Sequence, residues 1–248
     1  MRGLTEADST VDPGAEAPGL LARLLEGGVL DRRSRAALLR RLAVVLGGSA
    51  RRAGAAAVAS GQWLTDTVTE IAPHVPVRDL PTLSSHHDGL VGDELATALI
   101  ENAARATGAI GAAAGVVSSL EFAAPPLLLS SPVQVAAETV AVIAVELKLV
   151  AELHEVYRRP AVGTPAVRTA AYLGAWTRRR ALAHGAGDGA AGMLSGAAGR
   201  ALRRRVVRRA GENAMSVLPL LTGAVASAGL NARQTRRLGE QICKDLRS

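Results

Sequence analysis

Hydrophobic positions recur with the period of an α-helix along most of the chain, and no stretch alternates long enough to predict a β-strand. Asp31 is placed to cap a helix, and Ser131 with Pro132 forms a second helix start. The predicted helices cover residues 18–27, 31–46, 50–71, 93–121, 131–158, 164–184 and 231–246, and a further predicted helix carries residues 200–209. This pattern predicts an all-α protein, a multi-helix bundle of helices rich in Ala, Gly, Val and Leu.

Changes in composition along the chain predict four parts. Residues 1–17 are polar and acidic and are expected to form a disordered arm, with no apolar core of the kind a signal peptide needs. Residues 18–72 form a small N-terminal helical part. Residues 73–90 contain three prolines and read as a linker. Residues 91–248 form the main helical domain.

Two apolar stretches raise the question of a membrane span. Residues 213–232 carry no charge and have the necessary length, but small and polar residues dominate them and Pro219 divides them. Residues 106–120 are too short before Glu121 interrupts them. We expect both to be buried core helices. The alternative is insertion as hairpins through close packing of small residues such as Gly111 and Gly115.

Composition narrows the compartment and the partners. Aromatic residues make up only 2% of the 248 residues, so the core must be built from small aliphatic side chains. Cys243 is the only cysteine, which excludes an intrachain disulfide and fits a reducing cytosol. The net charge of +7 comes almost entirely from arginine, a bias that a GC-rich bacterial genome also produces. A basic balance allows nucleic acid or an anionic membrane surface as a partner.

The strongest concentration of charge is an arginine run on a predicted helix with a narrow apolar stripe. No aromatic platform for single-stranded nucleic acid lies near it, so anionic lipid is the better functional partner. The alternative is a solvated face paired with acids elsewhere. The candidate anionic-surface residues are Arg200, Arg203, Arg204, Arg205, Arg208 and Arg209.

Glu146 is the most interesting single side chain. Successive residues of a helix turn by about 100°, which places Glu146 near the centre of the apolar face of the 131–158 helix. A carboxylate there is a possible buried acid, with a raised pKa unless it is paired. The functional interpretation is a proton-handling or ligand-binding acid. The structural alternative, which we favour, is an ion pair with one of the many arginines.

Motifs for known catalytic or cofactor chemistry are missing from the sequence. His86, His87 and Asp88 lie together, but adjacent histidines in a loop point apart and no third ligand is evident. His154 and Glu155 begin like a zinc-protease helix, but the second histidine of that motif is replaced by Arg158. We therefore expect no metal, no cofactor and no catalytic residue, and can identify no small-molecule substrate.

One family resemblance covers roughly residues 90–245. The segment AARATGAIGAAAGVV, a proline-rich break and a long helix ending in ELHEVYRRP resemble the EcsC family. Tyr157 stands at a family tyrosine, while Arg158 replaces the glycine that follows it. The C-terminal family pattern is carried by Leu218, Pro219, Gly223, Gly229, Thr235, Arg236 and Gly239. The resemblance implies a membrane-associated or transporter-linked helical protein and supplies no active site.

These observations leave three functional hypotheses. The first is a non-catalytic, cytoplasmic interaction protein, held peripherally on the inner face of the plasma membrane by anionic lipid or a membrane protein and linked to a transporter. The second is an enzyme or proton-handling protein that uses Glu146. The third, less favoured, is a basic nucleic-acid-binding module. Only the first uses both the arginine run and the small-residue apolar helices.

Overall fold

The computed structural model describes residues 13–25, 30–123, 131–182 and 221–248, and within these ranges it confirms the all-α prediction, since no strand is present. The helices are α1 (Pro13–Leu25), α2 (Arg32–Ala53), α3 (Ala55–Ser60), α4 (Gln62–Ile71), α5 (Leu80–Ser85), α6 (Gly92–Ala123), α7 (Ser131–Val156), α8 (Pro165–Leu182) and α10 (Leu221–Arg247), with a 3-10 helix η1 at Ala72–His74.

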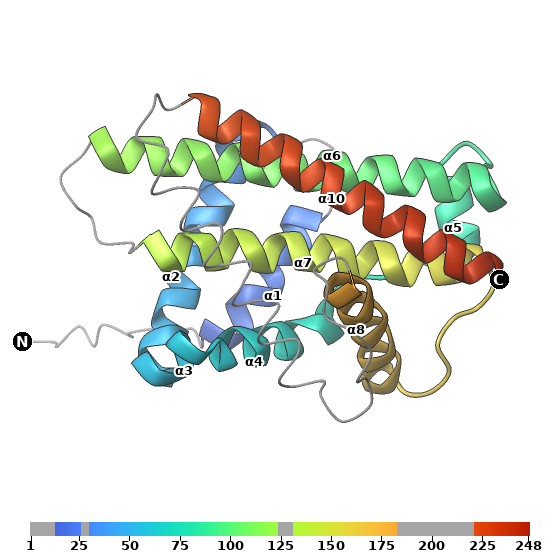
Figure 1. Ribbon diagram of the computed structural model, residues 1–248, viewed down its shortest axis with the longest axis horizontal. Coiled ribbons are helices and arrows are strands. Elements are labelled where there is room, and N and C mark those ends of the chain that lie inside the picture. The colour runs from blue at the N-terminus through green and yellow to red at the C-terminus, as the bar shows by residue number, and fades with distance from the viewer. Residues whose placement is uncertain (1–12, 26–29, 124–130, 183–220) are drawn as a thin grey trace, which may run out of the picture.

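Helix α7 lies at the centre of the bundle. In Figure 1, α6 runs alongside α7 and α10 crosses α6 obliquely, while α1 and α2 pack behind them. Almost every residue of α7 from Val135 to Leu153 is buried. A helix that is buried on all sides requires other helices around it, and the buried apolar side chains accordingly form one continuous core from α1 to α10.

Small residues allow α6 and α10 to approach closely. A β-carbon built on Gly111 would lie 3.0 Å from the backbone of Ser227 and 2.8 Å from Asn231 Nδ2. At Gly239 it would lie 2.5 Å from Ile100 Cγ1. At these positions the two helices are too close for larger side chains. The low aromatic content of the chain agrees with this close packing of small residues.

The N-terminal helices differ from their predicted bounds. Residues 1–12 of the predicted arm lie outside the described residues, and the first helix begins at Pro13, with Pro18 inside it. Asp31 does cap α2, accepting a hydrogen bond from Ser34 N at 2.7 Å. However, α2 continues through the predicted stop at Gly47–Gly48, because Gly47 is buried against Val133 of α7.

Two left-handed glycines divide the predicted 50–71 helix. Gly54 and Gly61 have φ of 87° and 80°, and they separate α2, α3 and α4. The predicted linker also contains more structure than expected. It holds η1 and the short helix α5, which Asp79 caps through Thr82 N at 3.0 Å.

The last helix begins earlier than its predicted start at Asn231. The spacing of Asn231 and Gln234 predicts a capping box at that start. This prediction is wrong, because α10 begins at Leu221 and both residues lie inside the helix. Asn231 is completely buried, and its side-chain amide donates to Thr107 O at 3.3 Å and to Glu138 Oε1 at 3.1 Å. The amide of Asn231 therefore makes its hydrogen bonds with α6 and α7, and not with the backbone at a helix start.

None of the helices in the described part of the chain is both long and apolar enough to cross a bilayer. Residues 213–220, the first part of one apolar stretch considered above, lie outside the described residues.

Candidate functional site

One exposed face of α2 gathers basic side chains. The helix contains seven arginines and no acidic residue. At about 100° per residue, five of these arginines fall within an arc of about 120°, and from the first to the last they span about 28 Å of the helix axis. All five are exposed, and they are named here the arginine face: Arg33, Arg40, Arg41, Arg51 and Arg52.

Most of the arginine face is not neutralised by acids. Arg41 forms an ion pair with Glu16 of α1. The other four form no ion pair with any carboxylate of the described residues. Like charges on one face repel one another in the free protein, and an anionic surface placed against that face would relieve the repulsion.

Apolar side chains lie within and beside the arginine face. Val44 lies near the middle of the arc and is 53% exposed. Immediately after Arg52, the chain turns at Gly54 into α3, where Ala55, Ala56 and Val58 are exposed to solvent. These exposed aliphatic groups could contact the interfacial region of a membrane when the neighbouring arginines face anionic lipid.

The predicted arginine run, residues 200–209, lies outside the described residues. The arginine face of α2 was missed by the sequence analysis. The signal that could have found it is the segment RRSRAALLRRLAVVLGGSARRA, in which arginine pairs recur without an acid. The arginine run at residues 200–209 has the higher local charge, so the binding surface was predicted there and not on α2.

Glu146 is completely buried and held by three side chains. Arg180 of α8 forms an ion pair with it through both carboxylate oxygens. Trp176 Nε1 donates to Oε2 at 2.8 Å, and Thr235 Oγ1 donates to Oε1 at 3.1 Å. With both oxygens accepting charge-assisted hydrogen bonds, this geometry favours the structural interpretation over a free catalytic acid.

The polar contacts around Glu146 continue between α6, α7 and α10. Thr235 Oγ1 and Thr107 Oγ1 lie 3.0 Å apart, so one hydroxyl donates to the other. Two turns before Glu146, Glu138 is also buried and accepts from Asn231 and Ser227. A connected set of buried polar groups fixes the register of α10 against α6 and α7, because any shift would leave donors without acceptors.

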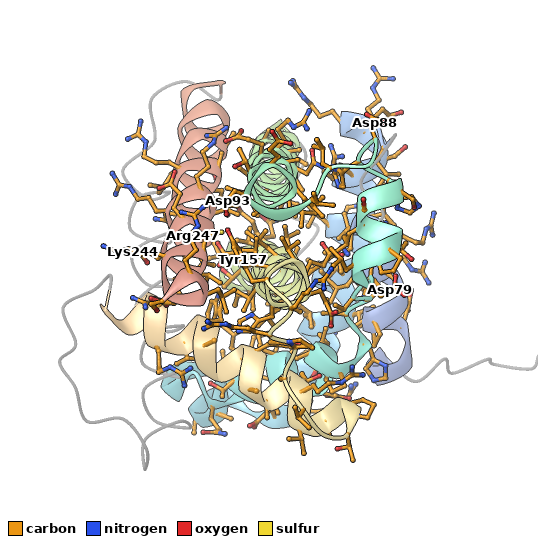
Figure 2. The ribbon with its side chains drawn as sticks, turned by 90° about the vertical axis from the view of Figure 1, so that its right-hand side faces the viewer. Asp79, Asp88, Asp93, Tyr157, Lys244 and Arg247 are labelled. Carbon is orange, nitrogen blue, oxygen red and sulfur yellow. The ribbon has the colours of Figure 1, made fainter. Side chains whose placement is uncertain are left out.

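A second cluster joins the ends of three helices near the C-terminus. Figure 2 shows Asp93, Tyr157 and Arg247 close together. Tyr157 Oη donates to Asp93 Oδ1 at 2.6 Å, and Arg247 Nε donates to the same oxygen at 3.1 Å. Burial, followed by the hydrogen bond to Asp93, raises the pKa of Tyr157. The phenol therefore stays protonated and acts as a donor that ties α7 to α6.

Arg158, at the position of the family glycine, has a left-handed backbone with φ of 53°. Its N–H donates to Glu155 O at 3.0 Å, and Arg159 N donates to His154 O at 2.8 Å. These two bonds form a Schellman motif, the helix ending in which glycine is preferred. Arg158 thus occupies a position where a glycine would be less strained.

The histidine pair occupies the turn after α5, and Asp88 there has φ of 53°. Among the described residues, no group of three or more His, Cys, Asp or Glu side chains could hold a metal ion.

Comparisons of the chain with protein-family models, curated proteins and solved structures find no match. The EcsC resemblance therefore stays a prediction.

Proposed function

We propose that the protein is a non-catalytic, peripheral membrane protein that docks on an anionic bilayer through the arginine face of α2. The carrying observation is the cluster of four exposed arginines that form no ion pair with a described residue, with Val44 among them. The cytoplasmic face of a plasma membrane is the proposed location, and the EcsC resemblance supports a membrane protein, such as a transporter, as a neighbour.

The expected strength follows from the number of unpaired arginines. Each arginine near an anionic bilayer contributes on the order of 1 kcal/mol at low salt. Four of them contribute about 4 kcal/mol, which corresponds to an increase in binding of roughly a thousandfold. The attraction decays within a Debye length, about 8 Å at physiological salt and about 3 Å at 1 M salt. Binding should therefore be strong at low salt and reversed by concentrated salt.

Sedimentation with lipid vesicles tests the proposal. The full chain is mixed with vesicles of phosphatidylcholine and phosphatidylglycerol, or of phosphatidylcholine alone, at low and at about 1 M salt. We expect binding only to the anionic vesicles at low salt. The α2 variant replaces four arginines with glutamine and should lose this binding. Its substitutions are R33Q, R40Q, R51Q and R52Q.

A matched variant distinguishes the effect of the arginine face from the effect of the net charge of the protein. It removes four exposed arginines from other parts of the surface, so its net charge equals that of the α2 variant, and it should bind as the unmodified protein does. Its substitutions are R159Q, R178Q, R233Q and R237Q. A third variant tests whether the arginine run contributes separately. Its substitutions are R203Q, R204Q, R208Q and R209Q.

Three results would overturn the proposal. Equal loss in the α2 variant and its matched control would mean that total charge, and not one face, drives binding. Binding to phosphatidylcholine alone that resists salt would mean insertion. Tight, salt-sensitive binding to RNA without vesicle binding would favour the nucleic-acid hypothesis.

A further inference from the structure

A cleft of about 260 Å³ lies on the side of α7 away from α6. The segment that joins η1 to α5 forms one wall, the second half of α7 forms the floor, and the first half of α8 forms the other wall. Leu147 and Ala151 of α7 and Val75 of the joining segment contribute apolar surface. In Figure 1, α8 lies beside the later part of α7, and in Figure 2 Asp79 marks the start of α5.

Charged groups of both signs line this cleft without neutralising each other. Arg78 is on the joining segment, Arg168 is on α8, and Glu155 is on α7. None of the three forms an ion pair with a described residue, although all three line one cleft. Charges gathered in one cleft and left unpaired are typical of a site whose ligand supplies the opposite charges.

Asp79 also lines the cleft, but its carboxylate is already engaged. It accepts hydrogen bonds from Thr82 that hold its pKa below the usual value. Asp79 therefore stays ionised and caps the start of α5, and it forms no ion pair with a described residue. The cleft thus carries two cationic and two anionic groups, a balance that a zwitterion matches.

The walls of the cleft are held in place by buried contacts. Lys148 is buried, and its Nζ donates to Pro76 O at 3.1 Å and forms an ion pair with Glu152. On the other wall, Tyr172 Oη accepts a hydrogen bond from Ala161 N at 3.1 Å. The tyrosine ring packs edge-on against His154 at a centroid distance of 5.1 Å. The cleft is therefore formed before any ligand binds, which lowers the entropic cost of binding.

We propose that this cleft binds a small zwitterion of the amino-acid class. The carboxylate of the ligand pairs with the guanidinium groups of Arg78 and Arg168, and its ammonium group faces Glu155. The apolar part of the ligand lies on Leu147 and Ala151. This site is independent of the arginine face on α2.

The size and the charge balance of the cleft select this class. The volume of the cleft is below the roughly 300 Å³ at which pockets for drug-sized molecules begin, so a small ligand fills it better than a nucleotide does. A plain anion would place a negative charge near Glu155, and a plain cation would place a positive charge near two arginines. A zwitterion with a short aliphatic side chain satisfies the three unpaired groups and the apolar floor together.

Isothermal titration with three apolar amino acids, L-leucine, L-valine and L-methionine, tests the proposal on the full chain. We expect at least one to bind at millimolar concentration or more tightly. N-acetyl-L-leucine lacks the ammonium group and L-leucinamide lacks the carboxylate, so each should bind about tenfold more weakly than leucine, the loss expected for one charged hydrogen bond.

Single substitutions assign the two ends of the ligand. R168Q and R78Q should each weaken binding of leucine about tenfold. E155Q should weaken binding of leucine but strengthen binding of N-acetyl-leucine, because the substitution removes the repulsion between Glu155 and a plain anion. General damage to the fold would not reproduce this pair of results. R178Q removes an exposed arginine of α8 that does not line the cleft, and should bind leucine normally.

The proposal is wrong if none of the three amino acids binds, if N-acetyl-leucine binds as tightly as leucine, or if R178Q weakens binding as much as R168Q. Vesicle binding by R168Q should equal that of the unmodified protein, so failure here and failure of membrane docking are distinguishable.

Discussion

Replacing Glu146 with glutamine separates the structural interpretation of this residue from the proton-handling one. The substitution E146Q keeps the shape of the side chain and removes its charge. In the folded protein the carboxylate is completely buried and accepts hydrogen bonds from Trp176, Arg180 and Thr235. If Glu146 is ionised, its loss removes a buried counterion of Arg180.

The size of the effect follows from burial and hydrogen-bond chemistry. The side chain of Arg180 is only 9% exposed, so water cannot replace the lost partner. A glutamine amide has one acceptor oxygen, and its NH₂ group would face the N–H donors of Trp176 or Arg180. Removing one partner of a buried ion pair costs about 3–5 kcal/mol. This is a large part of the roughly 5–15 kcal/mol that stabilises a typical domain.

Urea denaturation at neutral pH measures the loss of unfolding free energy. An unchanged slope of this free energy against urea concentration would show that the substitution does not alter the unfolded state. E101Q is the matched control, because Glu101 pairs with Arg236 at the surface, where the two side chains are 46% and 41% exposed. That substitution should cost less than about 1 kcal/mol. A loss for E146Q no larger than the loss for E101Q would refute the ion-pair reasoning and revive a neutral, proton-handling Glu146.

Two further predictions concern the backbone. R158G should raise the free energy of unfolding by up to about 1 kcal/mol, measured by the same urea titration, because glycine accepts the left-handed φ of 53° at this helix end without strain. G111A should lower the free energy of unfolding by about 1–3 kcal/mol, since the new methyl group would meet the backbone of Ser227 at 3.0 Å. Its control G229A, on the facing helix with open space around the new methyl group, should raise that free energy by up to about 1 kcal/mol. Destabilisation by both alanines, or by neither, would contradict the packing argument.

Local chemistry made the helix starts at Asp31 and near Ser131 predictable from the sequence. A side-chain cap depends only on residues three positions apart, as the contact from Ser34 N to Asp31 shows. Helix ends at glycine were harder to assign. Gly47 continues a helix because α7 packs on it, whereas Gly54, with φ of 87°, ends the same helix. Whether a glycine continues or ends a helix depends on what it contacts in the fold. The flanking sequence does not contain this information.

The surroundings of Glu146 were likewise predictable only in part, because some of them depend on neighbouring residues and others on residues far along the chain. The burial of Glu146 followed from the period of one helix. Its partners Trp176 and Arg180 lie 30 and 34 residues later, on a different helix. The chain has many arginines, and the sequence around Arg180 does not distinguish it as the one that pairs with Glu146 in the core. Asn231 was misassigned for the same reason, because its contacts with Thr107 and Glu138 span more than 90 residues.

The arrangement of the arginines is the strongest reason to look beyond genome composition for their cause. A mutational bias towards arginine would place the side chains without regard to neighbouring acids. On α10 the pattern is mixed, since Arg236 and Arg247 pair with Glu101 and Asp93 of α6. On α2, five of the seven arginines share one exposed arc, and no acidic residue lies within the helix. Packing on the core does not require this face to be basic, because its side chains point to solvent. We therefore propose that an anionic surface supplies the counter-charge that α2 lacks, in which case the charge density of this one face matters more than the net charge of the chain.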